Sequence, residues 1–260
     1  MAVNESFIDS ATLRENVVSL ARNIGYVPRS KKSAVARVNF SVDVSSSNAL
    51  SVRLNAGLVA LRNVQGGNFV FSIPEDITVT PNSNKIANFN DILIYEGTYL
   101  TKSFQVNASQ TNQRFILPNS NIDTSSIRVQ VKEDGSDLPY TAYANIFDVN
   151  SESRLFLVQE IEDEKYQILF GDGIIGKKPS DKAEITVSYI VTNGENGNGA
   201  ANFNFSGTLI SNTGATIVDG ISLLTTIQSS ENGDSIESID NVKYLAPRVY
   251  ASQYRAVTPN

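Results

Sequence analysis

The sequence contains no cysteine, no histidine and no tryptophan, and its single methionine is Met1. The absence of cysteine excludes disulfides and thiolate chemistry. Because histidine is also absent, the commonest metal ligands and the Ser-His-Asp and Cys-His arrangements of nucleophilic enzymes are not available. An enzyme with this composition would have to work with carboxylates, lysine or tyrosine.

Long apolar runs are also missing, so the sequence predicts no membrane-spanning helix, and the polar N-terminus lacks the apolar core of a signal peptide. The formal net charge of −6 gives no general reason to expect nucleic acid as a partner. With 260 residues the chain can bury a sizeable core, as one large β domain or as two smaller ones.

The segment from Glu5 to Ile24 has the spacing of an amphipathic helix, and Gly25 followed by Pro28 is a stop signal. A lone helix of this length is marginal in water, so its apolar stripe must be covered. The stripe either packs on the chain's own β domain or bundles with another chain, and amphipathicity does not separate the two. For the second alternative the candidate partner-interface residues are Phe7, Leu13, Val17, Leu20 and Ile24.

A basic linker, Arg29 to Lys32, follows, and from Ala34 the apolar period changes to two. Further strand-like runs recur at short intervals with turn-forming residues between them, which is typical of a sandwich or of antiparallel sheets. We therefore predict a mainly β fold with flanking α-helices. Its expected parts are a helix with the basic linker (1–33), an antiparallel β domain (34–230), and a C-terminal helix with the start of a following region (231–260). The alternating apolar residues of the first strand are Ala36, Val38, Phe40, Val42 and Val44.

The C-terminal helix is predicted from a capping box, with Asp234 as N-cap and Glu237 three residues later. An apolar stripe follows, and Pro247 is expected to end the helix. Between Phe205 and Ser230 the sequence is apolar but weakly patterned, and it predicts a mixture of loop and short strand.

The stretch from Lys165 to Asn202 predicts two strands, Tyr166 to Phe170 and Glu184 to Val191, joined as a glycine-rich β-hairpin. Gly171, Gly173 and Gly176 match the G-x-G-x-x-G pattern of dinucleotide-binding proteins. That motif needs a helix N-terminus to hold the pyrophosphate, whereas here a period-two strand follows. We therefore expect a tight turn that binds no small molecule.

Two further chemical interpretations rest on acidic and amide side chains. The carboxylates of Glu160, Glu162, Asp163 and Glu164 suggest a glycosidase pair, but consecutive residues on a strand point to alternating faces. A calcium site would need several convergent oxygens, and the sequence lacks the spacing of a calcium-binding loop. Its candidate ligands would be Asp172, Asn193, Glu195, Asn196 and Asn198.

Several segments together resemble the baseplate wedge proteins of T-even-type contractile-tailed bacteriophages, the baseplate J-like group. The central motif consists of Phe170, Gly171, Asp172, Gly173 and Gly176 in the predicted hairpin, followed by the run from Val187 to Gly199. The other matching segments are Glu5 to Pro28, Ile94 to Gly97, Ile116 to Asn119, Glu237 to Pro247, and Arg255 to Thr258.

This resemblance implies a structural subunit without enzymatic activity and without a cofactor, which corresponds to the central part of a longer protein. It also implies that the protein pairs with a second copy and with other wedge subunits in a ring around the baseplate hub. The resemblance further implies that this ring rearranges and thereby triggers sheath contraction. The expected location is the virion tail baseplate, assembled in the bacterial host cytoplasm. The alternative from another class is a carbohydrate- or calcium-binding β module of the adhesin type.

Overall fold

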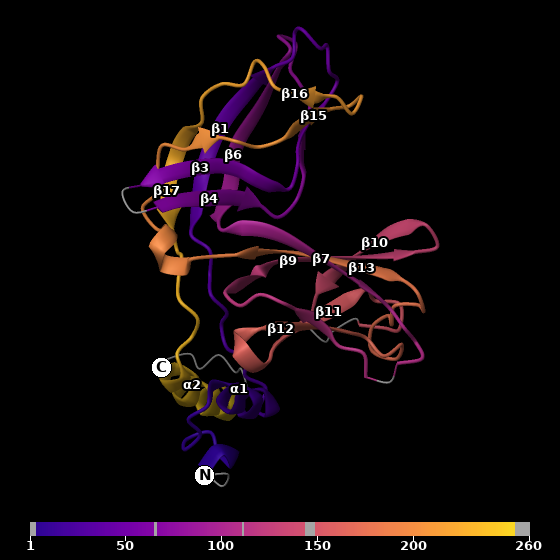
Figure 1. The fold of residues 1–260 in the computed structure, drawn as a ribbon, viewed down its shortest axis with the longest axis vertical. Coiled ribbons are helices and arrows are strands. Elements are labelled where there is room, and N and C mark those ends of the chain that lie inside the picture. Colours follow the sequence, from indigo (N-terminus) through magenta and orange to yellow (C-terminus); the bar gives the residue numbers. More distant parts are fainter. Residues whose placement is uncertain (1–3, 65–66, 111, 144–148, 253–260) are drawn as a thin grey trace, which may run out of the picture.

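A computed structural model describes residues 4–64, 67–110, 112–143 and 149–252, and it is mainly β with a helix at each end of the chain. Three parts follow one another along the long axis of the molecule (Figure 1). We call them the helix pair, the central β unit and the distal β unit. The structure thus confirms the predicted fold class, mainly β with antiparallel sheets and flanking helices.

The distal β unit contains a six-stranded sheet in the order β14-β3-β4-β6-β1-β17 and a four-stranded sheet in the order β16-β15-β2-β5. Its strands are β1 (Val35–Asp43), β2 (Val52–Leu54), β3 (Gly57–Val64), β4 (Gly67–Ile73), β5 (Ile77–Val79), β6 (Ile86–Glu96), β14 (Asn204–Phe205), β15 (Leu209–Ser211), β16 (Thr216–Ile217) and β17 (Thr225–Glu231).

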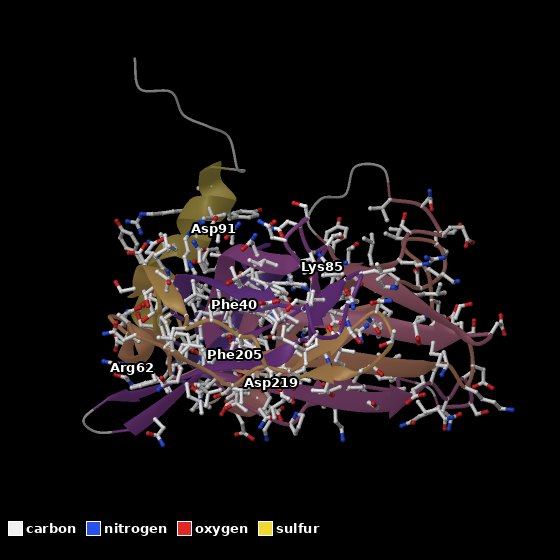
Figure 2. The ribbon with its side chains drawn as sticks, turned by 90° about the horizontal axis from the view of Figure 1, so that it is seen from above. Phe40, Arg62, Lys85, Asp91, Phe205 and Asp219 are labelled. Carbon is white, nitrogen blue, oxygen red and sulfur yellow. The ribbon has the colours of Figure 1, made fainter. Side chains whose placement is uncertain are left out.

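The core of the distal unit is aromatic. Phe40 of β1 stacks on Phe89 of β6 with ring centroids 4.5 Å apart, and Phe205 of β14 lies 5.1 Å from Phe40 (Figure 2). The five alternating residues predicted for the first strand are all buried. Four of them lie in β1, where a period of two places every second side chain on one face of the sheet, and Val44 directly follows the strand.

The central β unit is one seven-stranded sheet in the order β7-β13-β9-β10-β11-β12-β8, with its own apolar core. Neighbouring strands are antiparallel except for β10 and β11, which are parallel. Its strands are β7 (Thr98–Gln105), β8 (Phe115–Leu117), β9 (Ile122–Glu133), β10 (Ser136–Ala142), β11 (Leu155–Glu160), β12 (Tyr166–Phe170) and β13 (Glu184–Val191).

The predicted hairpin between Tyr166–Phe170 and Glu184–Val191 is wrong, although both strands have the predicted bounds. β9, β10 and β11 lie between them in the sheet. Hairpin loops commonly contain two to five residues, and the connection from Gly171 to Ala183 is much longer. The short connection lies instead between β11 and β12, where the Ile161 amide donates to the Lys165 carbonyl at 2.8 Å.

The three parts are nested in the order of the chain. The sequence runs from α1 into the distal unit through β6, then makes the whole central unit from β7 to β13, returns to the distal unit with β14, and ends in α2. Both helices consequently lie at the same end of the molecule (Figure 1).

The helices are α1 (Arg14–Asn23) and α2 (Ile239–Ser252), with short 3-10 turns at η1 (Asn4–Ser6), η2 (Glu162–Glu164) and η3 (Gly194–Gly197). The helix predicted from Glu5 begins only at Arg14, because the Glu5 carboxylate accepts hydrogen bonds from the Thr12 and Leu13 amides and holds the preceding residues in a turn. None of the helices in the described part of the chain has the length and apolar character needed to cross a membrane.

Both predicted signals of the second helix are wrong. Asp234 forms a β-bridge with Lys32 and does not cap the helix; Ser238 does, accepting from the Asn241 amide at 3.2 Å. Pro247 lies inside α2, and the Arg248 guanidinium donates to the Tyr244 carbonyl at 2.7 Å in the same turn. The tail segment Arg255 to Thr258 lies outside the described residues.

Gly97 connects the distal unit to the central unit, and only glycine fits there. Its φ is +133°, and a Cβ atom would lie 2.5 Å from both the Ile190 Cγ2 and the Val191 carbonyl oxygen. Gly135, in the turn between β9 and β10, also has a positive φ (+79°), but a Cβ there would meet open space.

We expect Gly97→Ala to destabilise the protein on the order of 3 kcal/mol, since backbone strain and overlap with the packed strand β13 act together. Gly135→Ala, the matched control, should cost only about 1 to 2 kcal/mol, the left-handed strain alone. Urea unfolding followed by circular dichroism measures both, and equal losses in the two variants would contradict the close approach at Gly97.

Candidate functional site

The five predicted interface residues differ in how deeply they are buried in the helix pair. Val17 is fully buried between α1 and α2, where it packs with Ala11, Ala21, Val242 and Ala246. Leu20 and Ile24 are half-buried against the same cluster. Phe7 and Leu13 are 64% and 51% exposed. The apolar stripe therefore has an inner part, covered by α2, and an outer part that faces solvent.

The start of α1 is fixed by the Glu5 carboxylate, which accepts from the Asn16 side-chain amide at 2.8 Å, from both the Thr12 hydroxyl and amide, and from the Leu13 amide. These hydrogen bonds, that from Asn16 first and those from Thr12 next, lower the pKa of Glu5 from its ordinary value of 4.5 to about 2. Amides at a helix N-terminus have no partner within the helix, so Glu5 supplies one from outside it.

One buried ion pair ties α1 to the central β unit. The Arg14 guanidinium donates to both carboxylate oxygens of Glu160 on β11, from Nε at 2.6 Å and from Nη2 at 3.0 Å. The two side chains are 14% and 5% exposed. Glu160, one of the carboxylates considered for catalysis, is thus held by an arginine and does not form a convergent pair with Asp163, which is exposed and bonded to Lys165.

Glu237 joins the exit of α1 to the entrance of α2. Its carboxylate accepts from the Tyr26 hydroxyl at 2.7 Å and the Arg29 amide at 2.9 Å, and its carbonyl accepts from Arg14 at 2.5 Å. It also accepts from the Asn241 side-chain amide at 2.7 Å. Glu237 is thus not part of the predicted capping box; its buried carboxylate fastens the two helices to the first linker through these hydrogen bonds.

Residues of two resembling segments, Ile94 to Gly97 and Val187 to Gly199, converge at the junction between the two β units. The Glu96 carboxylate, fully buried at the end of β6, accepts from the Thr192 hydroxyl at 2.6 Å, the Asn193 amide at 3.0 Å and the Asn193 side-chain amide at 2.7 Å. A Cβ atom on Gly197 would lie 2.6 Å from the Glu96 Cγ, so glycine is required beside this carboxylate.

The loop from Gly171 to Gly176 folds back on itself. Asp172 accepts from the Ile174 and Ile175 amides at 2.8 and 2.9 Å, and these bonds, that from Ile175 first, lower the pKa of Asp172. A Cβ atom on Gly171 would overlap the Gly176 carbonyl carbon at 2.2 Å. Phe170, beside the loop, packs edge-on against Phe115 and Tyr140, with ring centroids 5.5 Å apart in each case.

Four of the five residues considered for calcium, Asp172, Asn193, Glu195 and Asn198, are engaged in hydrogen bonds within the protein. Asn193 donates to Glu96, Asn198 exchanges hydrogen bonds with Gly233, and Glu195 accepts from the Ser235 hydroxyl at 3.4 Å. The part of the chain that the structure describes contains no group of three or more acidic side chains arranged to hold a metal ion. These polar groups connect chain segments to one another.

The polar groups described above join chain segments within the protein, and comparison with known proteins finds a similarity to a bacteriophage baseplate wedge protein. The chain is similar to the Baseplate wedge protein gp6 of Enterobacteria phage T4, with 24% identity over 274 aligned positions that cover 99% of this chain and 41% of the relative. The chain therefore spans about two fifths of that relative's length. No protein-family model matches the chain.

This similarity confirms the resemblance to the baseplate wedge proteins, at a distance, over nearly the whole of the chain. The resembling segments Ile94 to Gly97 and Val187 to Gly199 meet at the Glu96 junction. Distant parts of the sequence thus contribute to one structural joint.

We expect Glu96→Gln to lower the free energy of unfolding by about 1 to 3 kcal/mol, because the new amide nitrogen would face the donors of Thr192 or Asn193 and leave one of them unsatisfied. Glu75→Gln, which changes an exposed carboxylate on the surface, serves as the control and should change stability by less than about 1 kcal/mol. Chemical denaturation tests both, and an unchanged midpoint for Glu96→Gln would contradict the clamp.

The lowered pKa of Glu5 predicts an acid-sensitive helix start. Because the folded-state pKa lies below the ordinary one, the contribution of Glu5 is complete above about pH 4.5 and is lost as the pH falls through about 2. The Thr12 and Leu13 amide resonances should titrate in that range. In Glu5→Gln they should not titrate, and NMR spectra between pH 6 and pH 2 measure the difference. A midpoint near 4.5 in the unmodified protein would contradict the prediction.

Proposed function

We propose that the chain is a structural part of a phage tail baseplate wedge and catalyses no reaction. The observation that carries the proposal is the similarity to a baseplate wedge protein along 99% of the chain. The internal use of the acidic side chains agrees with this role, since Glu160, Glu237 and Glu96 each connect two chain segments.

The helix pair is the proposed partner-binding element, together with the basic linker of the segment 1–33. Its outer surface carries large apolar side chains that no other described element covers: Phe7 and Leu13 near α1, and Tyr244 and Tyr250 on α2. Exposed apolar groups clustered at one end of a molecule are typical of protein interfaces, where aromatic residues are enriched. Val17, in contrast, serves the internal packing of the pair.

The proposed partners are other wedge subunits and a second copy of the same protein, which together would build the ring around the hub. In this proposal the ring takes part in the rearrangement that triggers sheath contraction, and the protein resides in the tail baseplate of the virion after assembly in the bacterial host cytoplasm. The β units would act as rigid bodies, because each has its own closed apolar core.

Replacing both Phe7 and Leu13 by serine should weaken self-association of the chain at least about tenfold, the change expected for losing more than about 1.4 kcal/mol of binding. Sedimentation velocity over a range of concentrations measures the dissociation constant. The thermal unfolding midpoint should remain close to that of the unmodified protein, because both side chains are exposed.

Leu223→Ser is the matched control, since Leu223 is also an exposed apolar residue but lies between β16 and β17 of the distal β unit. It should leave association unchanged. Val17→Ser should lower the unfolding midpoint by removing a buried side chain. Equal association constants for the double variant and the unmodified chain would contradict the helix pair as the interface.

A further inference from the structure

The helix pair has its own apolar core, separate from that of the central β unit. Ala11, Val17, Ala21, Val242 and Ala246 form one cluster, and none of them belongs to the cluster of the seven-stranded sheet. Two bodies with separate cores move relative to one another unless specific contacts fix them.

A groove of about 580 Å³ lies between the two bodies. Val18 and Arg22 of α1, with Tyr26 and Val27 after it, line one side, and the strand β11 from Phe156 to Glu160 lines much of the other. Leu157 is 48% exposed and Val27 is 72% exposed. Val18 and Phe156, which also line the groove, are buried, so the apolar surfaces of the two bodies close on each other only in part.

Hydrogen bonds from α1 reach across the groove to Glu160 of β11. Its carboxylate accepts both bonds from Arg14, and its carbonyl accepts a longer bond, 3.4 Å, from Arg22. A buried ion pair adds little net stability, but it is sensitive to geometry and demands one arrangement of its two partners. The Arg14–Glu160 pair therefore sets the angle of the helix pair more than it contributes to the free energy of folding.

The connection between the bodies consists of two antiparallel linkers. Lys32 and Asp234 exchange backbone hydrogen bonds, both at 3.0 Å, and the Ser30 hydroxyl contacts the Thr124 hydroxyl of β9 at 2.9 Å. On the helix side of the Lys32–Asp234 bridge, the Glu237 carboxylate joins the second linker to Tyr26 and Arg29 of the first. The chain segments between Ser30 and Lys32 and between Asp234 and Ile236 are the place about which the helix pair can turn as one body.

We propose that the Arg14–Glu160 ion pair is a conformational latch that holds the helix pair at one angle to the central β unit. When the pair is broken, the helix pair turns about the two linkers, and the groove opens or closes with it. The inference goes beyond the proposed function and holds for the isolated chain whether or not it serves in a baseplate.

The absence of native cysteine allows a direct distance measurement. Asp240→Cys, on the exposed first turn of α2, and Asp137→Cys, on the exposed side of β10, place one spin label on each body. Double electron–electron resonance on this doubly labelled chain should give a single narrow distance distribution. Adding Glu160→Gln should produce a second distance or a broadened distribution, with an unchanged far-UV circular dichroism spectrum.

The control is Asp91→Asn, which breaks the exposed Arg37–Asp91 ion pair of the distal unit and should leave the distribution narrow. If Glu160→Gln does not fold, Arg14→Gln removes the same ion pair from the helix side and decides the question. A broad distribution in the unmodified labelled chain, a narrow one after loss of the pair, or equal broadening in Asp91→Asn would each overturn the latch.

Discussion

The structure depends on buried carboxylates at the places where the chain crosses from one part to another. Glu96 stands where the distal unit meets the central unit, Asp123 where the first linker passes β9, and Glu237 where the helices meet the linkers. Each accepts at least one backbone amide from a segment distant in sequence. An amide buried at such a crossing needs a partner, and a carboxylate offers several acceptor sites in a small volume.

Nesting makes these crossings necessary. The central unit is inserted in the distal unit, and both β units together are inserted between the two helices. Each boundary is therefore crossed twice, by an outgoing and a returning segment, and the two must be joined. Gly97 and Gly197 allow the segments to approach closely, because a side chain on either would overlap the neighbouring chain. The buried carboxylates join the outgoing and returning segments at these boundaries, and the glycines let the segments come close enough to be joined.

Local patterns in the sequence predicted the elements better than their pairing. The period-two runs identified β1 and β13, because alternation is a property of each strand alone. The apolar run of β12 was also predicted, and both β12 and β13 have the predicted bounds. The pairing of β12 with β11 depends on residues outside the stretch from which the hairpin was predicted. Strand β10 (Ser136–Ala142) is hard to predict from the sequence, because its polar residues and Pro139 interrupt the apolar alternation that marks the other strands. The burial of Val17 could not be predicted either, since the residues of α2 that cover it come from the opposite end of the chain.

The clamp residues Glu96 and Glu237 lie within segments that carry the family resemblance. Their hydrogen-bond partners are distant in sequence, so the fold alone shows which residues they bind.

The paired linkers also determine how the molecule carries a mechanical load. Tension between the helix pair and the β units stretches both linkers at once, and in the same direction, because both join the same two bodies. The backbone bonds between Lys32 and Asp234 are therefore neither sheared nor unzipped by such a pull, and the force passes through two covalent chains in parallel. A pull on the helices therefore enters the distal β unit through the neighbouring strands β1 and β17 together.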